Sequence, residues 1–158
     1  MNIVPELRIR LCGPEAAEEV HRLTQLAFKD YDRLDPPSGA VRETVDTVRE
    51  DLERAGGVVA DIDGIAVGCL RFEREPGLLR VRRVAIDPAW QRRGLGTALM
   101  NWTHDSAREQ GLGEVRVGVR RALPGNIAFY ERLGYTLLAE HRHPGYAEVT
   151  WLEMSRRL

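Results

Sequence analysis

Residues 84–97 read Val84-Ala85-Ile86-Asp87-Pro88-Ala89-Trp90-Gln91-Arg92-Arg93-Gly94-Leu95-Gly96-Thr97. An apolar strand ends here, the chain turns at Asp87-Pro88, and two arginines and two glycines open a long helix. The unpaired N–H groups and the dipole of a helix N-terminus attract an anion. Gly94 and Gly96 let a phosphate approach the backbone closely, and the arginines can donate charge-assisted hydrogen bonds to it. The pattern therefore predicts a diphosphate site.

Other interpretations of this segment are weaker. A second Gly-Leu-Gly, at residues 111–113, ends the same predicted helix and serves there only as a C-cap and turn. The tripeptide alone therefore means little, and its place after a strand and beside two arginines favours diphosphate binding over a plain helix start. A dinucleotide-binding fingerprint would need a third glycine where Leu99 stands. A P-loop would need a Gly-Lys pair, and the only lysine is Lys29.

The periodicity of apolar residues predicts strands and helices on both sides of this segment. The strands are expected at residues 7–11, 58–62, 65–72, 78–86, 114–119, 136–142 and 147–154. Four helices are expected. The first has the apolar face Ala16, Val20, Leu23 and Ala27, and the second has the apolar face Val41, Val45, Val48 and Leu52. The third covers residues 94–110, with Leu95, Leu99, Trp102 and Ser106 on one face, and the fourth covers residues 126–133.

The resulting order, β-α-α-β-β-β-α-β-α-β-β, sets the fold class. The strands before and after the long helix can be parallel neighbours, whereas the hairpins must be antiparallel. We expect an α/β (α+β) fold with a mixed, mostly antiparallel twisted sheet and helices on both faces, forming a single domain over residues 1–158.

Length and composition exclude several classes of protein. The 158 residues include 23 basic and 24 acidic side chains, a net charge of −1 that gives no global electrostatic case for nucleic acid. No apolar run approaches the length of a membrane span. Cys12 and Cys69 imply no disulfide framework in a chain of this size. We expect a cytoplasmic protein that binds neither nucleic acid nor a membrane.

The four histidines give no metal signature. His141 and His143 share a face of a predicted strand, but no further ligand stands at a suitable spacing, and the end of a surface hairpin is the better interpretation. His21 and His104 are expected to be exposed helix residues. We therefore expect no metal.

Two motifs resemble a known family. Gln91-x-x-Gly94-x-Gly96, after a Val-Ala-Ile-Asp-Pro strand, resembles the acyl-CoA signature of the GNAT superfamily of N-acetyltransferases. The stretch Asn126-Ile-Ala-Phe-Tyr-Glu-Arg-Leu-Gly-Tyr135 is similar to a second motif of that superfamily, and the predicted element order agrees over essentially the whole chain. The resemblance implies two central parallel strands that splay apart at a bulge, acetyl-CoA as the acyl donor, and a primary amine as the acceptor.

The resemblance also implies roles for individual residues. Backbone groups of Val84, Ala85 and Ile86 would bind the pantetheine arm as an added strand does, and one N–H would polarise the thioester carbonyl. Asn126 would hold the pantetheine or the adenine-side arm, and Phe129 would pack against the cofactor. Tyr130 would protonate the departing CoA thiolate, the alternative being that it only packs its helix onto the sheet. The donor-binding loop would comprise Gln91, Arg92, Arg93, Gly94, Leu95, Gly96 and Thr97, with Arg92 through Thr97 around the pyrophosphate.

The general base and the acceptor stay open. Many members of the family place a Glu on the strand before the signature, where this chain has Arg82. Glu73 could replace the missing base by acting through water; the alternative is that Glu73 is only a solvated surface residue. Arg82 would favour an acceptor that carries a carboxylate or phosphate, and Tyr31 would line the acceptor.

Two functions from different classes follow. One is an N-acetyltransferase that acts by direct attack of a small-molecule or peptide amine in a ternary complex. The other is a catalytically inactive acyl-CoA-binding sensor or partner module, which Arg82 at the usual base position keeps in consideration. A homodimer is also left open, since exposed final strands often pair between subunits in this superfamily.

Overall fold

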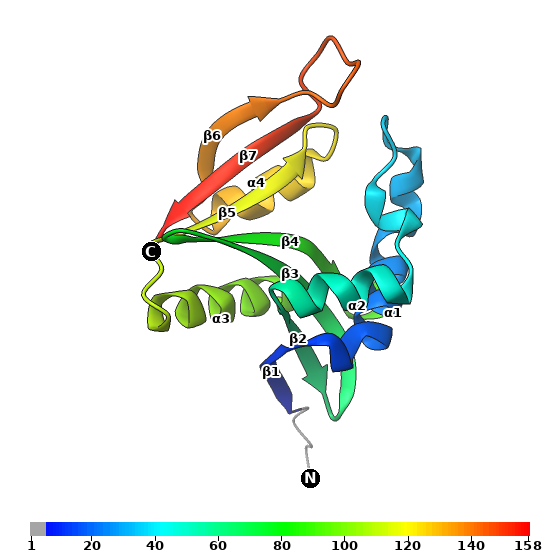
Figure 1. The fold of residues 1–158 in the computed structure, drawn as a ribbon, viewed down its shortest axis with the longest axis vertical. Coiled ribbons are helices and arrows are strands. Elements are labelled where there is room, and N and C mark those ends of the chain that lie inside the picture. The colour runs from blue at the N-terminus through cyan, green and yellow to red at the C-terminus, as the bar shows by residue number, and fades with distance from the viewer. Residues whose placement is uncertain (1–5) are drawn as a thin grey trace. The chain divides into compact units, whose positions relative to one another are not determined.

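The computed structural model describes residues 6–158, so residues 1–5 of the domain expected over 1–158 lie outside the described residues. Seven strands form one sheet in the order β1-β2-β3-β4-β5-β7-β6 (Figure 1). β4 and β5 are parallel, and β1–β2, β2–β3, β5–β7 and β6–β7 are antiparallel, which confirms the predicted mixed sheet. The strands are β1 (Leu7–Cys12), β2 (Gly57–Ile62), β3 (Ile65–Glu75), β4 (Leu78–Ile86), β5 (Glu114–Arg120), β6 (Thr136–His141) and β7 (Trp151–Arg157).

The helices confirm the predicted order. They are α1 (Ala17–Phe28), α2 (Val45–Arg54), α3 (Leu95–Glu109) and α4 (Pro124–Arg132), with short 3-10 turns at Pro14–Ala16, Lys29–Arg33, Gly39–Arg42 and Pro88–Trp90. The helix expected to include Val41 begins only at Val45, because Thr44 and Thr47 form a capping box there. The Thr44 hydroxyl accepts from the Thr47 N–H (3.2 Å), and the Thr47 hydroxyl accepts from the Thr44 N–H (2.9 Å). Val41 lies in the preceding 3-10 turn.

The last strand also begins later than predicted. β7 starts at Trp151, whereas the alternation of apolar residues placed its start at residue 147. The Tyr146 N–H donates to the His143 carbonyl (3.1 Å), and the His143 N–H donates to the Thr150 hydroxyl (2.9 Å). Residues between the two strands therefore form a hydrogen-bonded turn, and β7 begins only after it.

The chain divides into two compact units. The first comprises the residues up to Glu73 together with Arg83–Thr103, and the second comprises Arg74–Arg82 with His104–Leu158. β3, β4 and α3 contribute residues to both.

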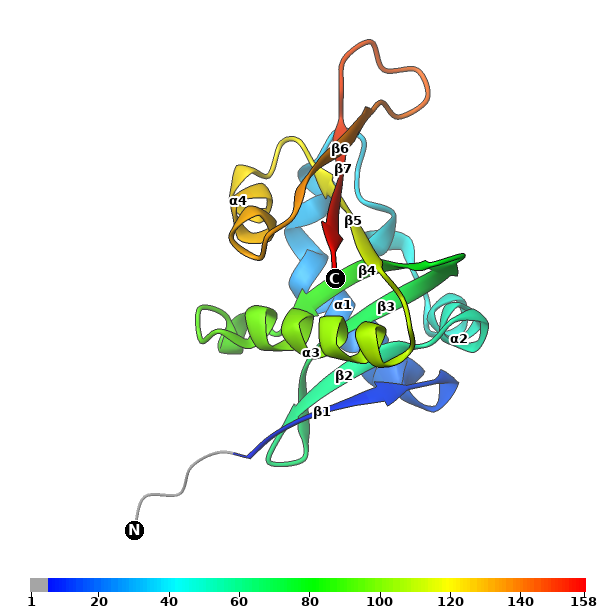
Figure 2. The same ribbon diagram turned by 90° about the vertical axis from the view of Figure 1, so that its left-hand side faces the viewer.

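In the first unit, an antiparallel run of strands is covered by helices. β2 is buried on both faces, as expected for a strand with helices on each side. Figures 1 and 2 show α1 and α2 on one side of β2 and β3 and the beginning of α3 on the other. The core beneath α1 and α2 includes Val20, Leu23, Val48, Leu52, Val59, Cys69 and Ala85.

In the second unit, β5 is paired on both sides. Its parallel ladder with β4 spans four residue pairs, from Leu78–Glu114 to Val81–Val117, and its antiparallel ladder with β7 spans the whole strand. Side chains on β5 alternate in burial, so that Val115, Val117 and Val119 are buried between partly exposed or exposed neighbours.

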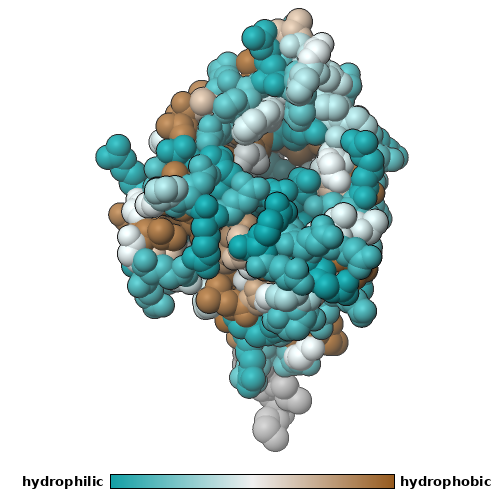
Figure 3. Space-filling view, in the orientation of Figure 1, coloured by the Kyte–Doolittle hydropathy of each residue, from teal (hydrophilic) through white to brown (hydrophobic). Residues whose placement is uncertain are grey.

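One face of the molecule is predominantly polar. Figure 3 shows hydrophilic residues over most of the face in view, with smaller apolar patches between them. Among residues 6–158, no helix is both long and apolar enough to cross a membrane.

Candidate functional site

The loop between β4 and α3 is folded back onto the end of its strand. The Asp87 carboxylate accepts from the Ala89 N–H (3.0 Å) and starts the 3-10 turn Pro88–Trp90. The Gln91 side-chain amide then donates to the Ile86 carbonyl (3.2 Å). Gln91 therefore fixes the path of the loop relative to the strand that precedes it.

The same loop exposes its arginines where α3 begins. Arg92 and Gly94 both have positive φ, +64° and +77°, so the backbone is in the left-handed region at two positions just before the helix. The Gly94 carbonyl accepts from the Ala98 N–H (3.0 Å), the first hydrogen bond of the helix. Arg92 and Arg93 are exposed, and the Arg93 guanidinium lies 4.9 Å from the centre of the Trp90 ring. Exposed guanidinium groups beside a helix N-terminus suit a phosphate group.

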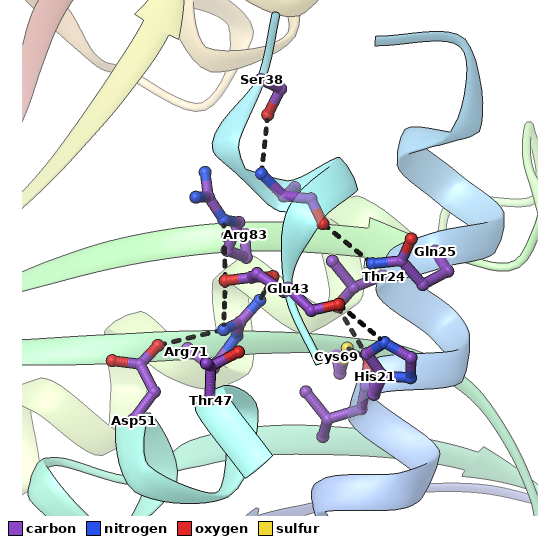
Figure 4. Close-up of polar contacts among 12 residues, drawn as sticks. His21, Thr24, Gln25, Ser38, Glu43, Thr47, Asp51, Cys69, Arg71 and Arg83 are labelled. Carbon is purple, nitrogen blue, oxygen red and sulfur yellow. Dashed lines mark hydrogen bonds and ion pairs between the residues drawn. The ribbon is translucent and has the colours of Figure 1, made fainter. Parts of the chain in front are cut away.

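The strand before this loop contains a bulge-like residue. Arg83, within β4, has φ +54° and is followed by Val84, Ala85 and Ile86. Its side chain belongs to a buried cluster in which the Glu43 carboxylate lies between the guanidinium groups of Arg71 and Arg83 (Figure 4). Arg71 also donates to Asp51 (3.0 Å).

Arg71 is the centre of this cluster and is 1% exposed. Two of its nitrogens donate to the two Glu43 oxygens, at 2.9 and 2.7 Å, in the bidentate arrangement that suits a guanidinium and a carboxylate. Burial by itself would lower the pKa of Arg71, but the hydrogen bond and charge of Glu43 and the charge of Asp51 outweigh it and raise that pKa. Arg71 therefore keeps its charge in the interior and is fixed by hydrogen bonds to both carboxylates.

The second motif lies on α4, in the second unit. Pro124 occupies the first turn, where a missing N–H is harmless. Asn126 is exposed, Phe129 is half-buried and Tyr130 is buried. The Tyr130 ring packs edge to face against Phe129 and Tyr135, with centroid distances of 5.0 and 5.5 Å. This aromatic packing fixes the direction of the Tyr130 ring.

His104 is buried and not exposed as predicted, with 1% of its surface accessible. Arg156 Nη1 lies 2.9 Å from its Nδ1, and a guanidinium can only donate. Nε2 therefore carries the ring proton of neutral His104 and donates to the Tyr135 hydroxyl (2.6 Å). Burial, with the neighbouring charges of Arg156 and Arg108, lowers the pKa of His104 to about 4.

This buried histidine predicts a pH dependence of stability. Between pH 6.5 and about 4, the His104 imidazole is protonated in the unfolded chain and neutral in the folded protein. The free energy of unfolding therefore falls as the pH falls through this window. We expect a loss of about 2 kcal/mol, measured by urea denaturation at a series of pH values. The slope should be smaller in His104→Gln and should not vanish, because the pKa values of His143, Glu114 and Glu153 are also lowered. An unchanged slope in His104→Gln would show that other groups cause it.

The remaining predicted residues lie outside these two sequence motifs. Arg82 is half-buried on β4 in the second unit, whereas Glu73 is exposed on β3 in the first. Tyr31 lies in the 3-10 turn Lys29–Arg33, packed edge to face on Phe28 at 4.8 Å. The donor loop belongs to the first unit and α4 to the second. Among residues 6–158, no three His, Cys, Asp or Glu side chains are grouped to hold a metal ion.

The sequence prediction did not identify the cluster of Glu43, Arg71 and Arg83. Glu43 is 28 residues from Arg71 and 40 from Arg83, so no local pattern joins them. The run Arg80-Val-Arg82-Arg83 was a weak signal, because charged residues at consecutive positions cannot all lie on one face of a strand.

Comparison with known proteins supplies the family. Residues 19–135 match the model of the Acetyltransferase (GNAT) family. The S-(2-succino)cysteine N-acetyltransferase of Bacillus subtilis (strain 168) is 29% identical over 142 residues, which are 84% of this chain and 86% of that protein.

Solved structures agree on the fold. The crystal structure of the ribosomal-protein-S18-alanine N-acetyltransferase from Escherichia coli superposes with a TM-score of 0.80 at 19% identity, covering 96% of this chain and 94% of that one. The PaiA N-acetyltransferase from Thermoplasma acidophilum, in complex with coenzyme A, gives 0.79 at 14% identity, covering 97% and 99%. The family match extends from α1 through α4 and includes both motifs. The chain therefore belongs to the GNAT acetyltransferase family and is an acyl-CoA N-acyltransferase.

Proposed function

We propose that this enzyme transfers an acetyl group from acetyl-CoA to a primary amine by direct attack in a ternary complex. The observation that carries the proposal is the loop Gln91–Thr97, which places exposed arginines at the N-terminus of α3 directly after a strand. A helix N-terminus of this kind suits the pyrophosphate of coenzyme A. Membership of the GNAT family supports acetyl-CoA as the donor.

Different residues would bind and orient different parts of the donor. Backbone groups of Val84–Ile86 bind and orient the pantetheine arm, and one N–H in this stretch donates to the thioester oxygen as negative charge develops there. Gln91 supports this stretch through the Ile86 carbonyl. Asn126 and Phe129 contact the donor from α4. Acetyl-CoA supplies an activated thioester, and holding it beside the amine accounts for much of the rate.

Proton transfer completes the reaction. The amine nitrogen forms a bond to the acyl carbon and loses a proton, the carbon–sulfur bond breaks, and the sulfur takes a proton from the Tyr130 hydroxyl. A phenol is a suitable donor because its ordinary pKa is near 10 and that of a thiol is near 8.5. Arg82 holds the position at which many family members carry a carboxylate, so Glu73 acting through water is the proposed route for the amine proton.

Calorimetric titration with acetyl-CoA tests the donor, with CoA, NAD and ATP as comparisons. We expect binding of acetyl-CoA and CoA alone. Absence of binding by either would contradict the proposal. Binding of acetyl-CoA without thiol release on any amine would favour the inactive acyl-CoA-binding module.

A charge-removal variant tests the loop directly. We expect Arg92→Gln/Arg93→Gln to raise the KM for acetyl-CoA about 30-fold, because each of the two lost guanidinium groups removes a charge-assisted hydrogen bond of roughly 1 kcal/mol. The KM for acetyl-pantetheine, which lacks the pyrophosphate and the nucleotide, should be unchanged. Equal effects on both donors would show that these arginines do not contact the diphosphate.

The acceptor is proposed to be an amine that also carries a carboxylate. Arg82 on β4 supports this, and so does the name of the Bacillus subtilis relative, which identifies S-(2-succino)cysteine as its substrate. A panel comparing S-(2-succino)cysteine, cysteine, a polyamine and an alanine-initiated peptide, with thiol release as the readout, tests this choice. Arg82→Ala should raise the acceptor KM selectively for the carboxylate-bearing amines. A preference for the polyamine would contradict it.

A further inference from the structure

Arg83 adopts a backbone conformation that its own chemistry does not favour. Three non-glycine residues in the described part of the chain have positive φ, namely Asp63, Arg83 and Arg92. Asp63 is in a hairpin turn and Arg92 in a loop, whereas Arg83 is inside a strand. An L-residue with a long side chain pays a steric penalty in this region that glycine avoids. Something other than local propensity must hold the residue there.

The side chain of Arg83 supplies an anchor. Its Nε donates to Glu43 Oε2 at 3.4 Å, and Figure 4 shows Nε facing the Glu43 carboxylate with the terminal nitrogens directed away from it. A Cβ placed on Gly39 would lie 3.2 Å from Arg83 Nη2, so the turn Gly39–Arg42 approaches the guanidinium closely. The Arg83 side chain is 24% exposed.

The anchor point is itself rigid. Glu43 is gripped by both terminal nitrogens of Arg71, and Arg71 is gripped in turn by Asp51 of α2. Glu43 directly precedes Thr44, the capping residue of α2. The two carboxylates are therefore shared among the guanidinium groups of Arg71, Arg83 and Arg54, and Arg83 is the member that belongs to β4.

From this arrangement we infer that Arg83 is a positioning residue: Glu43, held by Arg71, grips its guanidinium and keeps β4 in the left-handed conformation at residue 83. The backbone of Val84–Ile86 is thereby aimed at the thioester. The inference rests on the proposed function of Val84–Ile86 and adds a device that sets their direction. In the competing role, Arg83 binds the carboxylate of the acceptor directly.

Two substitutions at residue 83 separate these roles. Glycine adopts φ +54° without strain and has no side chain, whereas alanine keeps the strain and loses the anchor. We expect Arg83→Ala to weaken acetyl-CoA binding about tenfold by calorimetry and Arg83→Gly to stay within about threefold of the parent. Glu43→Gln should weaken binding in the parent and have no further effect in the Arg83→Gly background. Arg49→Ala, which breaks an exposed ion pair within α2, is the matched control.

Amide hydrogen exchange provides a readout that needs no ligand. Protection at Val84–Ile86 should fall in Arg83→Ala and Glu43→Gln and be retained in Arg83→Gly and Arg49→Ala. If the parent binds no acetyl-CoA but the exchange pattern holds, the proposed function fails and the anchor stands. Equal losses in Arg83→Gly and Arg83→Ala would overturn the inference. So would normal donor binding in Arg83→Gly combined with a raised acceptor KM, because the guanidinium would then bind the acceptor.

Discussion

Arg71→Met is expected to lower the free energy of unfolding by about 3 kcal/mol, the low end of the effect of breaking a buried ion pair. The guanidinium of Arg71 is the main counter-charge of two carboxylates, Glu43 and Asp51, whose side chains are 14% and 7% exposed. Removing it leaves both acidic groups poorly solvated. Glu43 keeps its weaker contact with Arg83, and Asp51 keeps Arg54 (2.8 Å), so the loss is not the sum of two isolated charges.

Arg71 also destabilises the fold through one unpaired buried group, which methionine lacks. Its Nε is buried and has no hydrogen-bond partner among the described residues, which offsets part of what the ion pairs contribute. Urea denaturation of Arg71→Met and of the triple variant Arg71→Met/Glu43→Gln/Asp51→Asn measures the balance. The triple variant should recover part of the loss because no buried carboxylate is left without Arg71, while Arg54 and Arg83 lose these carboxylates at more exposed positions. The exposed control Arg49→Met should change stability by less than about 0.5 kcal/mol. A loss below about 1 kcal/mol in Arg71→Met would contradict the expectation.

The pattern of apolar residues predicted those elements whose boundaries are set by local chemistry. β4 was predicted at its observed bounds because a turn precedes it and Asp87-Pro88 ends it. The N-terminus of α3 followed from the glycines and arginines after that turn. The same reasoning placed the start of α2 too early, since it counted Val41 as part of the apolar face and overlooked the cap at Thr44.

Features that depend on distant partners could not be predicted in this way. Leu95 and Leu99 of α3 are buried as predicted, but the buried stripe continues through Thr103 and His104, so a pattern based on hydrophobicity left His104 exposed. Its burial depends on Tyr135 and Arg156, which are 31 and 52 residues away. Nothing in the sequence around Arg83 marks a left-handed residue either, because the conformation depends on Glu43.

Tyr130→Phe is expected to lower kcat for acetyl transfer about 100-fold, the lower end of the usual contribution of a positioned general acid. The substitution removes one hydroxyl and keeps the ring, so the edge-to-face contacts with Phe129 and Tyr135 persist. Acetyl-CoA binding and the melting temperature should therefore change little. Thiol release measures kcat, and calorimetry measures donor binding on the same protein.

The leaving group distinguishes proton donation from packing. A thioester whose thiol has a low pKa needs little protonation as the sulfur departs, so Tyr130→Phe should lose much less activity with an acetyl thioester of an acidic aromatic thiol than with acetyl-CoA. Tyr135→Phe is the matched control: it removes a buried hydroxyl that accepts from His104, and it should destabilise the fold by about 1 kcal/mol while sparing the dependence on the leaving group. An equal loss with both thioesters in Tyr130→Phe would assign the residue to packing. The enzyme would then release CoA as a free thiolate. This is feasible because the pKa of a thiol, near 8.5, is only modestly above neutral pH.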